Sequence, residues 1–218
     1  AICTGDIKGQ IDFFTDKLGM ELQSMYWMHG VPDTWHAFLR LNDESSLTFV
    51  SNPQIKQIPM EMGHTHSGNP GANSAAGTMQ HVALKVDSYD ELLDMRDRLR
   101  TKGVPVLGPM DHGMCFSIYF AGLENLSLEL AFSAEALDQD MWIDTEVTEL
   151  AGISPEELEK YKKPEEFKGQ KGAVPQPELD DTKGPHMTNY PPGVYEKSMQ
   201  LSDDFVLNMV ESTPPGKS

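Results

Sequence analysis

The sequence is poor in several features that would assign a chain to a well-known class. It has two cysteines, Cys3 and Cys115, in 218 residues, which is too few for a disulfide framework, so we expect a reducing, cytoplasmic environment. It has no apolar run long enough to cross a bilayer. It also lacks a signal-peptide pattern, but because it opens inside an apolar run, we expect its natural start to lie upstream. Walker and Rossmann glycine loops and a Ser-His-Asp order are absent as well.

Positive charge is also scarce. The chain carries 17 basic and 34 acidic side chains, for a net charge of −17. Such a field repels phosphate, so nucleic acids and anionic membrane surfaces are excluded as partners. Solubility is the simplest role of this charge, and a small molecule is the expected ligand.

Residues 1–52 have an order of elements that the chain later repeats. Apolar side chains recur at helical spacing from Ile7 to Leu18, and Gly19 is placed to end that helix. A short strand precedes the helix at residues 1–4. Three more strands are expected after it, at residues 20–28, 35–41 and 46–50.

Residues 80–133 predict the same order again. A strand at residues 80–86 leads to Ser88, an N-cap residue with Glu91 three positions on, as in a capping box. The helix that follows stops at Gly103. Strands are then expected at residues 104–107, 117–120 and 127–132. The sequence therefore predicts an α+β fold of two βαβββ modules.

The remaining segments have few core-forming residues. Residues 53–79 are rich in Pro, Gly, Asn and Ser and read as a connector loop. Residues 134–218 read as a mostly irregular C-terminal arm with one short helix, which begins at Ser154–Pro155. Because such an arm cannot bury a core alone, we expect its few aromatic residues to anchor it on a folded surface.

Two residues of the second module suit a divalent metal. His81 opens the first strand of that module, and Glu129 stands between Leu128 and Leu130 on its last strand. A carboxylate on an apolar strand is costly without a charged partner, which favours metal ligation. The alternatives are an ordinary histidine at a strand edge and an outward-facing glutamate of an alternating strand.

The chain resembles the vicinal oxygen chelate superfamily, which includes glyoxalases, bleomycin-resistance proteins and extradiol dioxygenases. The motifs that carry the resemblance are the paired βαβββ units and three segments of sequence. These segments are Phe13-Phe14 through Leu18-Gly19-Met20, His81-Val82-Ala83-Leu84, and Ser117-Ile118-Tyr119-Phe120 with Leu128-Glu129-Leu130. The likeness covers about residues 1–133 and implies that the two modules form a curled mixed sheet around a shared metal site.

The resemblance also implies a set of ligands. His81 matches the first-strand ligand position of the second module, and Glu129 matches its last-strand position. In the first module the last-strand position falls near Thr48, where no carboxylate stands. The first-strand position would lie two residues before Ala1, and we expect a histidine there as the third ligand. Two histidines and a glutamate occupy one face of a metal and suit Fe(II) or Mn(II), with Zn(II) or Ni(II) also open.

A second pattern resembles the extradiol dioxygenases in particular. His112 is followed by five residues, then Ile118, Tyr119 and, later, Glu129. By this resemblance His112 is a catalytic acid or base and Tyr119 a catalytic donor to a metal-bound oxygen. The chain departs from the pattern at Gly122–Asn125, where those enzymes have a Pro-x-Gly turn. A plain turn histidine and a packed tyrosine are the alternatives.

Other side chains are candidates for the pocket wall. We expect His36 and Met114 to bind substrate. His64-Thr65-His66 reads as a rim loop, with metal chelation as the other interpretation. Several methionines cluster near the proposed site, either as core filling or as a pliant apolar pocket: Met25, Met28, Met60, Met62, Met79, Met110 and Met114.

Three functions remain open at the level of sequence. The first is a metal-dependent extradiol-type dioxygenase, an oxidoreductase that acts on an aromatic or vicinal diol. It matches the His112 pattern, because that pattern joins an acid or base to the metal ligands. The second is a glyoxalase-like lyase or isomerase, which the missing carboxylate near Thr48 disfavours. The third is a metal-free protein that sequesters a drug or metabolite. We expect a homodimer in each case.

Overall fold

The computed structural model describes residues 1–169, 172–180 and 185–217. Residues 170–171, 181–184 and 218, part of the expected arm, lie outside the described residues. The chain divides into two compact units, residues 1–137 and 138–217. Each is described by itself below.

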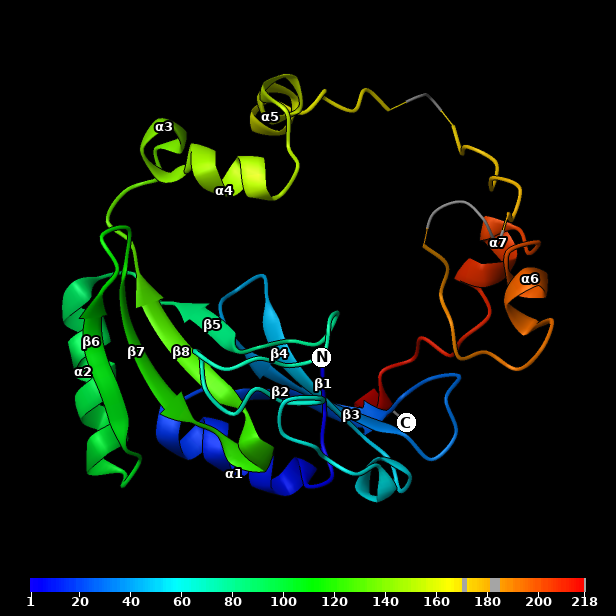
Figure 1. The fold of residues 1–218 in the computed structure, drawn as a ribbon. Coiled ribbons are helices and arrows are strands. Elements are labelled where there is room, and N and C mark those ends of the chain that lie inside the picture. Colours follow the sequence, from blue (N-terminus) through cyan, green and yellow to red (C-terminus); the bar gives the residue numbers. More distant parts are fainter. Residues whose placement is uncertain (170–171, 181–184, 218) are drawn as a thin grey trace. The chain divides into compact units, whose positions relative to one another are not determined.

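The unit of residues 1–137 contains both modules. The first module forms a four-stranded mixed sheet in the order β1-β4-β3-β2 (Figure 1). Strand β1 pairs with β4 in parallel, and the other pairs are antiparallel. The elements, in chain order, are β1 (Ile2–Cys3), α1 (Ile7–Leu18), β2 (Leu22–Trp27), β3 (Trp35–Arg40) and β4 (Ser46–Ser51).

The second module repeats this topology as β5-β8-β7-β6, with β5 and β8 parallel. The α+β fold of two βαβββ modules is therefore confirmed. The expected curled sheet consists of two four-stranded sheets, and neither sheet closes on itself. The elements are β5 (Val82–Lys85), α2 (Tyr89–Thr101), β6 (Val106–Asp111), β7 (Phe116–Ala121), η2 (Leu123–Asn125) and β8 (Ser127–Phe132).

The two long helices begin and end at the residues that their sequences indicate. Gly19 follows α1 with φ +78°, a left-handed conformation that suits glycine. At the start of α2, the Ser88 side chain accepts a hydrogen bond from the Glu91 N–H. The capping box is incomplete, however, because the Glu91 carboxylate accepts from the Asp87 N–H at 2.8 Å and not from that of Ser88.

One continuous apolar core serves both modules. Helix α1 packs on β3 and β4, and α2 packs on β6, β7 and β8 (Figure 1). Phe14 of α1 and Phe49 of β4 are fully buried, with ring centroids 5.3 Å apart. On the second sheet Leu99 of α2 and Ile118 of β7 are also fully buried. Filling this layer leaves the opposite face of each sheet to carry the polar side chains.

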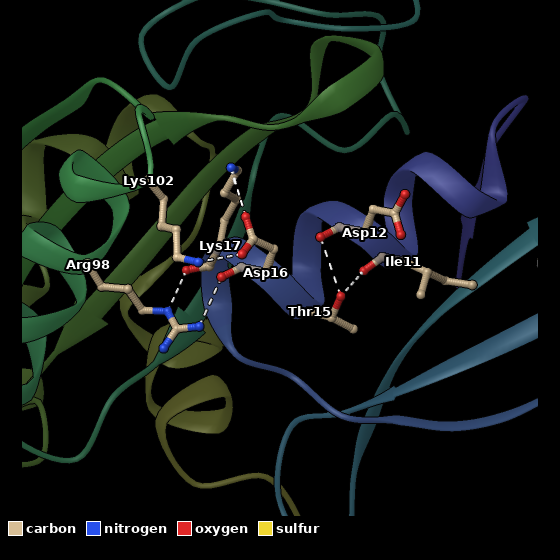
Figure 2. A network of polar contacts seen from close by, with 7 residues as sticks. All are labelled: Ile11, Asp12, Thr15, Asp16, Lys17, Arg98 and Lys102. Atoms are coloured by element: carbon tan, nitrogen blue, oxygen red, sulfur yellow. Dashed lines mark hydrogen bonds and ion pairs between the residues drawn. The ribbon is translucent and has the colours of Figure 1, made fainter.

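Polar contacts join α1 to α2 at one end (Figure 2). The Arg98 guanidinium donates to the main-chain oxygens of Asp16 and Lys17, which end α1, at 2.9 and 2.8 Å. The Lys102 ammonium pairs with the Asp16 carboxylate. Cations at a helix C-terminus offset its exposed carbonyl groups, so this cluster fixes the second module's helix against the first.

A single carboxylate makes a second junction. Glu124, in the turn before β8, accepts hydrogen bonds from the Thr4 hydroxyl at 2.6 Å and the Gln10 amide at 2.9 Å. It also accepts from the Gly5 N–H at 2.8 Å. The sequence separations exceed a hundred residues, so this turn ties the end of the second module to the start of the first.

One strand differs from its predicted range. The sequence predicts a strand at residues 104–107, but β6 runs from Val106 to Asp111. It therefore continues through Gly108–Pro109, with a change of register between Leu107 and Met110. Strand β6 pairs only with β7, and an edge strand tolerates a residue without an N–H group.

The second unit is more helical than the sequence predicts. The expected helix is α5 (Pro155–Lys162), and Ser154 and Glu157 form its complete capping box. Four further short helices were not predicted: α3 (Gln139–Trp142), α4 (Thr145–Leu150), α6 (Val194–Ser198) and α7 (Asp203–Leu207). Single turns also lie at η1 (Ile55–Gln57) and η3 (Pro215–Lys217). Among the described residues, no helix has the length and apolar character that a membrane span needs.

Candidate functional site

His81 and Glu129 meet on the second sheet. His81 immediately precedes β5, and its Nε2 atom lies 2.8 Å from Oε2 of Glu129 on β8. Glu129 is buried, with 7 % of its surface exposed, whereas His81 is half-buried. The other ring nitrogen of His81 lies 3.0 Å from the Gln80 side-chain oxygen, which orients the imidazole. The fold brings together the two residues that the sequence predicts as metal ligands.

The position of Glu129 follows from strand alternation. Its neighbours Leu128 and Leu130 are buried, at 2 % and 4 % exposure, in the apolar core. Alternation therefore turns Glu129 to the opposite face of β8. Ala83 and Tyr119 flank it in register on the adjacent strands. A buried carboxylate on this face requires a partner, and His81 is the partner within reach.

Tyr119 and His112 form a second pair beside the first. Tyr119 lies opposite Glu129 on β7, and its hydroxyl lies 3.0 Å from Nε2 of His112. The rings of His81 and Tyr119 have centroids 6.3 Å apart. Burial raises the pKa of the Tyr119 phenol above its usual value, and a hydrogen bond with Ser117 opposes the rise. The phenol therefore stays protonated at neutral pH, and its hydroxyl is able to donate a hydrogen bond.

The first module has no equivalent cluster. Its strand register places Thr48 opposite Phe38, as Glu129 is placed opposite Tyr119 in the second module. The place of the Glu129 carboxylate is therefore taken by the Thr48 hydroxyl in the first sheet, and the place of the Tyr119 phenol by the Phe38 ring. This difference agrees with the alignment of Thr48 and Glu129 that the repeat implies.

His36 lies on this first sheet, separate from the pair on the second. Its ring contacts that of Phe38 on β3, with centroids 4.5 Å apart. Its Nε2 atom is buried and has no hydrogen-bond partner among the described residues. Burial lowers the pKa of this imidazole. His36 is thus a neutral ring with one nitrogen unused.

Met114 lies at the tip of the β6–β7 hairpin, beside His112, and 42 % of its surface is exposed. Of the seven clustered methionines, six are exposed and Met28 is half-buried, so core filling is the wrong interpretation for this group. Two of them line cavities of the first unit: Met60 and Met79.

The connector adds a residue that was not chosen from the sequence. His66 and Thr65 line a cavity of about 240 Å³ that His81 also lines. The Ser67 hydroxyl donates to the main-chain oxygen of Gln80 at 2.5 Å, which holds this part of the connector beside the start of β5. His64, by contrast, is exposed. The His-x-His pattern was the available signal, but its spacing alone does not tell which ring faces inward.

The donors present fit part of a metal site. An imidazole nitrogen and a carboxylate oxygen directed at each other are borderline ligands for divalent transition metals. Within residues 1–169, 172–180 and 185–217, no group of three His, Cys, Asp or Glu side chains is close enough to hold an ion. These residues therefore supply two donors, and further ligands have to come from elsewhere.

Comparisons with known proteins agree with the fold. A family model described as the Glyoxalase/Bleomycin resistance protein/Dioxygenase superfamily matches residues 1–141. A comparison with curated proteins found no significant match.

Several solved structures have a similar arrangement of elements. One is a glyoxalase/bleomycin resistance protein/dioxygenase from Nocardioides, at 20% identity and TM-score 0.42, with 63% of this chain and 85% of that chain covered. Another is a domain of the same description from Frankia, at 14% identity and TM-score 0.44, covering 61% and 92%. A third is a fosfomycin resistance protein from Listeria monocytogenes, solved with Mn(II), at 16% identity and TM-score 0.42, covering 64% and 92%.

Proposed function

Because the chain belongs to the Glyoxalase/Bleomycin resistance protein/Dioxygenase superfamily, we propose that it is a metal-dependent enzyme of the extradiol dioxygenase type. Its substrate would be an aromatic or otherwise vicinal diol. The observation that carries the proposal is the 2.8 Å contact of His81 with Glu129, beside the 3.0 Å contact of Tyr119 with His112. Two metal-type donors would thus lie beside a tyrosine and a loop histidine that would exchange protons with the substrate.

His81 and Glu129 would hold the metal. Members of the superfamily typically bind a divalent cation, and this donor pair suits Fe(II) or Mn(II), with Zn(II) or Ni(II) as alternatives. When bound, the cation would supply Lewis acidity to two adjacent substrate oxygens. A further histidine would be the third ligand.

The other residues would bind the substrate and move protons. Tyr119 keeps its proton because burial raises its pKa, so it donates a hydrogen bond to a substrate oxygen. His112 lies within hydrogen-bond distance of the Tyr119 hydroxyl and would act as the acid or base toward the substrate, while Tyr119 stays protonated. His66 shares a cavity with His81 and would contact the same ligand. His36 and Met114 remain proposed substrate contacts, and the homodimer and the cytoplasmic location remain proposals.

The test uses Fe(II) and catechol. Protein loaded with Fe(II) without oxygen is mixed with catechol, the visible spectrum is recorded, and O₂ uptake is followed after air is admitted. The proposal expects a new absorbance band and O₂ uptake. Glu129→Gln removes both, whereas Glu135→Gln, at an exposed residue beyond β8, retains them. Loaded protein that gives neither signal contradicts the dioxygenase.

The same measurement separates the two other functions. A glyoxalase-like lyase or isomerase would turn over its substrate without O₂ uptake. A sequestering protein would be stabilised by its ligand after treatment with a chelator, with no turnover.

A further inference from the structure

A second, larger cavity lies in the first unit, at the start of the connector. Its volume is about 440 Å³. Much of its wall is apolar and comes from one short segment, in which Ile55, Ile58 and Met60 take part. An engineered protein cavity of about 150 Å³ is sufficient for benzene. This cavity therefore has room for a ring that bears an alkyl chain.

The larger cavity adjoins the one that His81 lines. Four residues belong to the walls of both cavities: Cys3, Thr65, His66 and Asn125. A molecule that fills the larger cavity thus lies next to the end of the sheet where His81 meets Glu129. The two cavities differ in character, since the larger one has a mostly apolar wall and the smaller one is lined by His81, the partner of Glu129.

The walls of the larger cavity are held in place by hydrogen bonds. The Asn52 side chain accepts from the Ile55 N–H at 3.0 Å, where η1 begins. The Thr65 hydroxyl accepts from the Glu61 N–H at 2.9 Å, which closes the loop between them. Pockets for small molecules are usually largely formed before the ligand binds, and these hydrogen bonds hold the wall segments in place without a ligand.

The carboxylate in the wall does not call for a cationic ligand. Glu124 already accepts hydrogen bonds from Thr4, Gly5 and Gln10. Both of its oxygens are therefore engaged by this chain. What remains for a ligand is mainly the hydrocarbon surface of residues 55–60.

We propose that this 440 Å³ cavity takes the apolar body of the substrate while its two oxygens lie at His81 and Glu129. This inference rests on the proposed function. It narrows the substrate class to diols that carry an alkyl or aryl substituent, and it assigns to Ile58 and Met60 the role of specificity-determining residues. Unsubstituted catechol would fill only the smaller cavity.

The experiment measures binding of two series of compounds by calorimetry. One is catechol and its 4-methyl, 4-ethyl and 4-propyl derivatives on Fe(II)-loaded protein without oxygen. The other is toluene, ethylbenzene and propylbenzene on metal-free protein. Ile58→Asp places a charge in the wall, and because Ile58 is 67 % exposed, this variant should fold. The matched control is Val31→Asp, in the β2–β3 turn, where Val31 is 42 % exposed. Met60→Gln is a second variant of the wall.

The expected result has a defined size. Each added methylene tightens binding by about fourfold in the native protein and in Val31→Asp, from the usual transfer free energy of a buried methylene. In Ile58→Asp and Met60→Gln this dependence on chain length is largely lost. The proposal would be overturned if the affinity of the native protein did not change with alkyl chain length. It would also be overturned if the affinity of Ile58→Asp rose with chain length as much as that of the native protein.

Failure of the proposed function gives a different result. The alkylbenzenes would still distinguish Ile58→Asp from Val31→Asp, which supports the apolar cavity. The catechols would then bind no better than the alkylbenzenes and would not respond to Glu129→Gln. That result would refute the placement of the diol oxygens at His81.

Discussion

Nε2 of His81 lies 2.8 Å from Oε2 of Glu129, although 48 positions separate the two residues in the sequence. The parallel pairing of β5 with β8 produces this contact, because it sets Ala83 beside Glu129 and leaves His81 just before the strand. The carboxylate of Glu129 is buried, and its contact with His81 satisfies both groups. A pair of this kind has the donors for a metal, and the whole functional account depends on it.

The first prediction concerns Tyr119 and His112. Tyr119→Phe and His112→Gln should each lower kcat/KM by about 100-fold or more, as expected for loss of a proton-transfer group. Because the two side chains are 3.0 Å apart and are proposed to act together, the double variant should lower kcat/KM little more than the worse single variant. Steady-state kinetics with a diol substrate checks this. Additive losses would show that the two residues act separately, and Tyr161→Phe, at an exposed residue of α5, is the control.

The second prediction concerns pH and the junction of α1 with α2. Hydrogen bonds from Lys102 and then Lys17 lower the pKa of Asp16 from 3.8 to about 2. A carboxyl group with a lowered pKa in the folded state contributes stability above its unfolded pKa, and that contribution is lost as pH falls toward the folded value. Asp16→Asn should therefore be less stable than the native protein at pH 6, and the difference should shrink between pH 4 and about 2.

Urea unfolding followed by circular dichroism at several pH values measures this difference. The exposed Asp94→Asn on α2 removes the same charge and serves as the control. A gap between native and Asp16→Asn that stays constant down to about pH 2 would contradict the role of the ion pairs.

The third prediction concerns Glu124. Replacing it by alanine leaves the Thr4 hydroxyl, at 1 % exposure, and the Gln10 amide, at 0 %, without their acceptor. Each unsatisfied buried polar group costs about 1–3 kcal/mol, so the two together should lower the free energy of unfolding of Glu124→Ala by about 2–6 kcal/mol. Glu124→Gln keeps one acceptor oxygen and should lose less. Chemical denaturation measures both, with Glu135→Ala as the control, and equal stability of Glu124→Ala and Glu135→Ala would count against the junction.

Much of the fold could be predicted because several local signals agree. Apolar spacing and Gly19 define α1, and Ser88 defines the start of α2. The helices of residues 138–217 were mostly missed because they are short. Helix α3 has four residues and α6 and α7 have five each, which is too few for an apolar period to appear. The path of β6 through Gly108–Pro109 was missed because sequence does not say which strand lies at a sheet edge.

The candidate site could be predicted only in part. Glu129 was predicted as a ligand because a carboxylate stands on an apolar strand, and both Glu129 and His81 match ligand positions of the family that the sequence resembles. The sequence could not show that His66 turns inward while His64 stays exposed, because that depends on how Ser67 fixes the connector to Gln80. Nor could it show that the methionines near the site are mostly exposed, since methionine suits a core and a surface equally.

The most direct test of the central claim is the affinity of the protein for Mn(II). The dissociation constant is measured by titration for the native protein, His81→Ala, Glu129→Gln and, as a matched control, His64→Ala, whose ring is 70 % exposed. Loss of groups that only support a metal ligand costs about 10–100-fold in affinity, so loss of His81 or Glu129 should weaken binding by at least about 100-fold. His64→Ala should bind as the native protein does. Equal affinity of all four proteins for Mn(II), or a loss confined to His64→Ala, would contradict a metal site at His81 and Glu129.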